Sequence, residues 1–162
     1  MTVITLADVV LFVHILGASI WVGGTVALGI VAVAVRSSLG DDPALYARTM
    51  SRIARSLGWM MWGALGVTIA TGLYNLTWFL GPTGMAGVSS TPWLVVKLLL
   101  VLFLVLVSAF HSFVLGPEIR RRSERGARNP SLQKWRSFDR ALTGISAALT
   151  VAVLFAAVML AS

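Results

Sequence analysis

The chain has no cysteine and few charged residues. Of its 162 residues, only 12% are Asp, Glu, Lys or Arg, against about 25% in soluble domains. The absence of cysteine excludes disulfides, thiolate metal sites and thiol catalysis. With 57% hydrophobic residues, the chain has too little polar surface to cover a globule in water. We therefore predict that lipid is the solvent for most of it.

Acidic residues are especially scarce, with six against thirteen Lys and Arg, for a net charge of +7. No acid lies in any of the four long apolar runs given below, and no serine stands in a nucleophile motif, so hydrolase chemistry is not expected. The basic residues flank the apolar runs, as in the cytoplasmic loops of membrane proteins. We expect the lipid bilayer, and no nucleic acid, as a partner.

Four apolar runs are long enough to cross a bilayer, which takes about 20 residues. They cover residues 9–35, 59–80, 93–115 and 141–161, and we expect Gly116-Pro117 to end the third helix. The first run is too long for the apolar core of a signal peptide and lacks a basic start. We predict one all-α integral membrane domain over residues 1–162, a four-helix bundle with its polar faces turned inward.

The segments between the runs differ sharply in charge. Residues 36–58 and 116–140 are basic, whereas residues 81–92 carry no charge. By the positive-inside rule, the basic segments are cytoplasmic and both termini lie outside. This predicts a multi-pass protein of a bacterial-type plasma (inner) membrane. Asp42-Pro43 and Asn129-Pro130 are typical helix starts, so each basic segment is expected to hold a short helix on the inner membrane surface.

Each run carries small or polar residues at helical spacing, which places them on one face. These residues are His14, Gly17, Ala18, Trp21 and Thr25; Met61, Ala64, Thr68, Thr71 and Asn75; Lys97, Val101, Leu104, Ser108 and His111; and Thr143, Ser146 and Thr150. For the Gly, Ala, Ser and Thr positions, the pattern favours close helix packing.

Three ionisable residues within the runs indicate function, because such groups are costly in a bilayer. They are His14, Lys97 and His111. Structural explanations stay open for each. His14 could bond to another helix, Lys97 could snorkel to the surface one turn after Trp93, and His111 could be satisfied by its flanking serines.

Depth along the helices separates these residues into two levels. At 1.5 Å per residue, His14 lies about 9 Å past Asp8, and Lys97 about 6 Å past Trp93. His111 lies about 27 Å past Trp93, so the two histidines are not expected to bind one metal.

The depths predict an outer and an inner site. The outer site would hold His14 and Lys97, with Asn75 or Tyr74. The inner site would hold His111, with Met61 and Ser146 at similar depth.

Three segments resemble the copper-resistance protein D family. They are FVHILGASIWVGG (12–24), WGALGVTIATGLYNL (62–76) and WLVVKLLLVLFLVLVSAFHSFVLGP (93–117). In the element H-x6-W-x-G-G, His14 stands at a set spacing from a tryptophan and two glycines. In the element K-x13-H, Lys97 stands at a set spacing from a second ionisable residue, His111. The superfamily also includes four-helix protoporphyrinogen oxidases that contain haem b.

The haem branch implies that membrane histidines are axial ligands, which carries over to His14 and His111, and it has a lysine near the haem where Lys97 stands. Gly17 and Ala18 would then leave room for the macrocycle, and Trp21 would pack on its edge. The copper branch implies copper uptake through histidine and methionine ligands, but the sequence lacks a methionine-rich path.

The main hypothesis is therefore a haem b membrane redox protein, with the haem bound by His14, Lys97, Trp21, Asn75 and His111. Whether it would be a haem-dependent oxidoreductase stays open, and a redox partner protein and a homo-oligomer are both compatible with it. The alternatives are a copper-binding or copper-transport protein, with His14 and His111 as metal ligands, and a non-catalytic membrane subunit.

Overall fold

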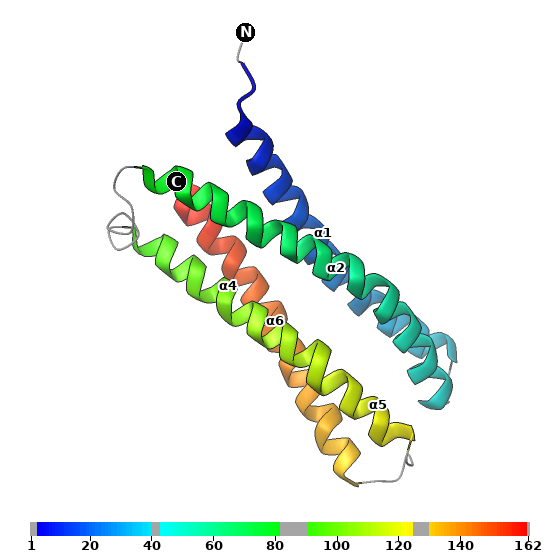
Figure 1. The fold of residues 1–162 in the computed structure, drawn as a ribbon. Coiled ribbons are helices and arrows are strands. Elements are labelled where there is room, and N and C mark those ends of the chain that lie inside the picture. The colour runs from blue at the N-terminus through cyan, green and yellow to red at the C-terminus, as the bar shows by residue number, and fades with distance from the viewer. Residues whose placement is uncertain (1–2, 40–42, 82–90, 125–129, 162) are drawn as a thin grey trace. The chain divides into compact units, whose positions relative to one another are not determined.

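The computed structural model describes residues 3–39, 43–81, 91–124 and 130–161, and every regular element in these ranges is helical (Figure 1). Four helical stretches within them are long and apolar enough to span a membrane. This confirms the prediction of an all-α chain with four membrane helices. The elements are α1 (Leu6–Leu39), α2 (Pro43–Leu80), α4 (Pro92–Phe110), the π-helix η2 (His111–Leu115), α5 (Gly116–Glu124) and α6 (Pro130–Ala161).

The chain forms two compact units, Met1–Gly84 and Met85–Ser162. In the first unit, α1 and α2 run side by side in opposite directions (Figure 1). In the second unit, α4, η2 and α5 follow one another along a single line, and α6 returns beside them. Each unit is thus a hairpin of two long helical arms.

Local sequence fixes two of the helix ends in the first unit. At the start of α1, the Thr5 backbone N–H donates to Asp8 Oδ2 at 2.8 Å, and the Asp8 N–H donates to Thr5 Oγ1 at 3.3 Å. This reciprocal capping satisfies two backbone donors that the first turn leaves open. At the C-terminal end of the second arm, Gly81 follows α2 with a φ of 45°, the left-handed conformation that terminates helices and favours glycine.

The predicted surface helix at the start of the second arm is not a separate element. Instead, α2 is continuous from Pro43 to Leu80, because no proline interrupts it and Gly58 alone costs a helix only about 1 kcal/mol. In the same way, α6 runs unbroken from Pro130 into the fourth apolar run. Both prolines stand at the first helical residue, as predicted. The proposed caps Asp42 and Asn129 lie outside the described residues.

The expected helix end at Gly116-Pro117 is also wrong. The helix continues through η2 into α5, and the Gly116 N–H bonds to the His111 carbonyl in the wider π geometry. Proline has no N–H, and its ring clashes with the carbonyl four residues earlier. One widened turn just before Pro117 accommodates both defects, so the chain passes the proline without leaving the helix.

Small residues bring α1 and α2 close together. Gly17 and Trp21 are the buried residues of α1, and a Cβ added at Gly17 would lie 2.5 Å from Thr68 Oγ1 and 3.1 Å from the Ala64 carbonyl. Further along, a Cβ at Gly24 would meet Met61 Cγ at 2.9 Å. The predicted small-residue stripe is therefore the contact face of this hairpin, which is the role expected for such residues in membranes.

The second unit buries a mixed apolar and hydroxyl face. Trp93 of α4 packs edge-on against Phe155 of α6, with ring centroids 6.1 Å apart. Among the described residues, the buried ones are Leu94, Leu104, Ser108 and Leu115 on one arm, and Thr150 and Ala156 on the other.

In both units, large apolar side chains are exposed. Examples are Ile30 of α1 and Val151 of α6, which are 65% and 66% exposed. An exterior of this kind suits contact with lipid.

We expect Gly17→Ala to destabilise the first unit by about 1–3 kcal/mol, the usual cost of overpacking. The added methyl would press on the α2 backbone at Ala64 as well as on a side chain. Gly23→Ala is the matched control, because a Cβ there has nothing within 4 Å. Unfolding of both variants in detergent measures the difference, and equal stabilities would contradict the close approach.

Candidate functional site

His14 is fixed across the first hairpin by its Nδ1 atom. Nδ1 lies 2.9 Å from the Thr68 carbonyl oxygen and 3.1 Å from Thr71 Oγ1. A carbonyl oxygen can only accept, so Nδ1 carries the proton and donates it. Thr71 is free to accept as well, because its own hydroxyl donates to the Val67 carbonyl at 2.6 Å. In the neutral imidazole, the lone pair that can bind a metal is then on Nε2.

Gly72 lets the imidazole reach this position, although the polar stripe predicted from the sequence does not include it. A Cβ at Gly72 would lie 3.0 Å from His14 Cε1 and 3.5 Å from His14 Nδ1. The ring therefore packs directly on the α2 backbone. The available indication in the sequence was a glycine directly after Thr71, a residue of the polar stripe.

The haem contacts expected at Gly17 and Trp21 stay a prediction, and the packing around both residues does not support them. The space beside Gly17 is filled by Thr68, so that glycine serves helix packing and leaves no room for a macrocycle. Trp21 is buried and packs edge-on against Trp62, with ring centroids 5.9 Å apart and planes at 69°. These residues do not fit haem in the way the sequence suggested.

Two buried N–H donors in the first unit have no partner among the described residues, Trp21 Nε1 and Asn75 Nδ2. Asn75 lies one turn after Thr71 on α2, as the stripe predicted. A buried donor without a partner costs about 1–3 kcal/mol. Because N–H groups are donors, neither atom can ligate a metal ion.

Met61 offers a thioether in the same hairpin, but at another level. It is buried and faces Gly24, which lies ten residues beyond His14 on α1. At 1.5 Å per residue, the two levels are about 15 Å apart. This confirms the prediction that Met61 does not lie at the depth of His14.

Lys97 lies on α4 in the second unit, partly buried and one turn after Trp93. None of the ion pairs formed within the described ranges includes it. Its predicted pairing with His14 joins residues of different units and stays a prediction.

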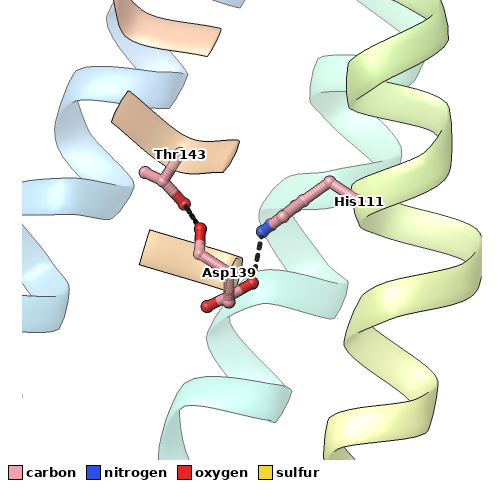
Figure 2. A network of polar contacts seen from close by, with 3 residues as sticks. All are labelled: His111, Asp139 and Thr143. Carbon is pink, nitrogen blue, oxygen red and sulfur yellow. Dashed lines mark hydrogen bonds and ion pairs between the residues drawn. The ribbon is translucent and has the colours of Figure 1, made fainter. Parts of the chain in front are cut away.

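His111 is paired with an acid that lies outside the predicted spans. Its Nε2 lies 2.9 Å from Asp139 Oδ1, and both side chains are about one third exposed or more, at 40% and 35%. Figure 2 shows the pair bridging the two arms of the second unit, with the Thr143 hydroxyl donating to the Asp139 backbone carbonyl at 2.9 Å. The hydrogen-bonding partner of His111 in this pair therefore comes from α6, whereas the structural explanation that the sequence left open was a bond to its flanking serines.

Asp139 was missed because it lies two residues before the predicted fourth span. The span was counted from the apolar run, whereas α6 begins at Pro130. The stripe of Thr143, Ser146 and Thr150, continued back by one turn, reaches Asp139. That spacing was the available indication, since residues four apart share a helix face.

The described side chains do not make a closed metal centre of acids and histidines. Among the described ranges, no three His, Cys, Asp or Glu residues are grouped so that they could hold an ion. The structure thus brings together His14 with Thr68, Thr71 and Gly72 in one unit, and His111 with Asp139 in the other. In both clusters, a ring nitrogen of the histidine faces an oxygen of the opposite arm.

We expect a double-mutant cycle of His111→Ala and Asp139→Ala to give a coupling free energy of about 0.2–1 kcal/mol, as for partly exposed ion pairs. Unfolding in detergent measures it. In the control cycle, Thr143→Val takes the place of Asp139→Ala, because the Thr143 hydroxyl bonds to the backbone carbonyl of Asp139 and not to its carboxylate. A coupling near zero for the first cycle would contradict the pair.

Comparison with known proteins gives one family. The model of the copper resistance protein D family matches residues 51–160, which include most of α2 and all of α4 to α5, while α1 and His14 lie outside the match. No curated protein and no solved structure matches the chain. The match supports the copper part of the resemblance and not the haem b oxidases. Because it covers more than half of the 162 residues, the chain belongs to the copper resistance protein D family.

Proposed function

We propose that this protein binds copper ions within the membrane and passes them across it, with His14 as a ligand. The family supports a copper-resistance membrane protein in general. The observation that carries the finer proposal is the bond from His14 Nδ1 to the Thr68 carbonyl. This interpretation replaces the haem b hypothesis as the favoured one.

The chemistry of His14 supports copper as the cargo. Imidazole is a suitable ligand for copper, and metal-binding histidines usually donate their other N–H to a carbonyl or carboxylate. Here the Thr68 carbonyl and Gly72 fix both the tautomer and the ring orientation. Met61 supplies a buried thioether further along the hairpin, and thioethers favour Cu(I).

Lys97 fits this function less well as a ligand. Its ammonium group has no lone pair while protonated, and it would repel a copper ion. We infer that Lys97 anchors α4 at the membrane surface, where the neighbouring turn presents Trp93. Tryptophan and lysine are both common at that boundary.

The copper test measures metal content and affinity in purified protein, together with copper accumulation in cells. His14→Ala should lose most of the bound copper, because the ligand is gone. Ser19→Ala is the matched control, because its hydroxyl bonds only within α1, to the Ile15 carbonyl. Copper binding that survives His14→Ala unchanged, or stoichiometric haem b in the purified protein, would contradict the proposal.

A second pair of variants tests ring orientation. Gly72→Ala should weaken copper binding by up to about 10–100-fold, the usual range for changes to groups that orient a ligand, because the methyl must push the imidazole by a few tenths of an ångström. Gly66→Ala on the same helix has nothing within 4 Å and should bind as the unaltered protein does. Titration with Cu(I) in detergent compares them, and equal losses would point to a general effect on α2.

We further propose that both basic segments face the cytoplasm of a bacterial-type plasma membrane, with both termini outside. A reporter fused after Arg128 should then be active only in the cytoplasm, and one fused after Gly87 only outside. The reason is the retention of Lys- and Arg-rich loops inside. External labelling of a tag after Arg128 would reverse the topology.

A further inference from the structure

The second unit carries an open apolar groove near the basic end of its hairpin. The groove has a volume of about 390 Å³ and is lined by Phe110 of α4 and by Lys134, Trp135 and Phe138 of α6. Phe110 and Phe138 meet edge-on at 6.4 Å between centroids and are 40% and 49% exposed. The aromatic walls therefore leave an open apolar surface between the two arms.

Positive charge surrounds this groove. The Arg122 guanidinium lies 4.8 Å from the Trp135 ring centroid and also bonds Glu118 at 2.7 Å. Lys134 is the charged residue of the lining, is exposed, and takes part in none of the ion pairs formed within the described ranges. Lys134 and Arg122 belong to a segment, residues 116–140, with eight Lys and Arg against three Asp and Glu, and this excess of positive charge attracts an anion.

We propose that this groove binds an anionic phospholipid, with an acyl chain between Phe110, Trp135 and Phe138 and the phosphate on Lys134. The walls offer apolar surface to a chain, and the rim offers a cation to a headgroup. A lipid carries both features in one molecule. Basic pockets at the ends of membrane helices are known to bind acidic headgroups in this way.

Other occupants match the groove less completely. Inorganic phosphate would engage Lys134 and leave the aromatic walls empty. A second copy of the chain would bring its own basic segment toward Lys134, and like charges repel. The proposal does not rest on copper binding, since none of the lining residues takes part in the His14 site.

The test uses the full-length protein in phosphatidylcholine vesicles that contain a minor fraction of brominated phosphatidylglycerol or, in the comparison, brominated phosphatidylcholine. Bromine quenches nearby tryptophan fluorescence. The chain has six tryptophans, so the signal of Trp135 is the difference between the unaltered protein and Trp135→Phe. We expect brominated phosphatidylglycerol to quench Trp135 several-fold more than brominated phosphatidylcholine at the same fraction, and added inorganic phosphate to leave this preference unchanged.

Charge variants decide whether the preference belongs to the groove. Lys134→Gln should abolish it and Lys134→Arg should retain it. Arg140→Gln removes one charge from an exposed position of the same helix outside the groove and should leave it intact. Equal quenching by the two lipids, an equal loss with Arg140→Gln, competition by inorganic phosphate, or a Trp135 that neither lipid quenches because a second copy covers it would each overturn the proposal.

Discussion

The hydrogen bond from His14 to the Thr68 carbonyl depends on how closely α1 and α2 approach. Glycines at positions 17 and 72 remove the side chains that would hold the two backbones apart. Only then can an imidazole on one helix reach a backbone oxygen on the other at 2.9 Å. The same approach gives the hairpin its packing and gives His14 its tautomer, so in this unit stability and chemistry rest on one constraint. In lipid such proximity matters more than in water, because no hydrophobic force draws the helices together.

The helices themselves were largely predictable, and their boundaries were not. Apolar length and the spacing of small residues identified four membrane helices and the face on which Gly17, Trp21 and Met61 are buried. The predicted helix ends were wrong where the helix continues past a residue that usually ends or starts one. Pro117 was expected to stop the third helix, whereas one π turn absorbs its missing N–H. The preference of a single proline does not reveal that the turn before it can widen and so keep the helix continuous.

The sequence singled out the two histidines, but their hydrogen-bonding partners could not be predicted from it. Ionisable residues in apolar runs pointed to His14 and His111, since burial of such groups needs a reason. Their partners lie 54 and 57 positions away for His14, and on the opposite arm for His111. One of these partners is a backbone carbonyl, which no residue type reveals. Asp139 carries a recognisable charge, yet it lies outside the predicted fourth span because the apolar run begins just after it.

The two histidines also differ in the charge that surrounds them, which bears on how a copper ion would cross. His14 is held by uncharged oxygens, and a neutral imidazole can bind a cation without first burying a charge of its own. His111 faces a carboxylate near the basic end of its unit. That carboxylate offsets positive charge where eight Lys and Arg gather between residues 116 and 140. In the proposed function, a copper ion would meet a neutral donor at His14, whereas the His111–Asp139 pair belongs to the other unit. A chain of net charge +7 repels a cation, and Asp139 is one of the three acids among residues 116–140 that offset this positive charge.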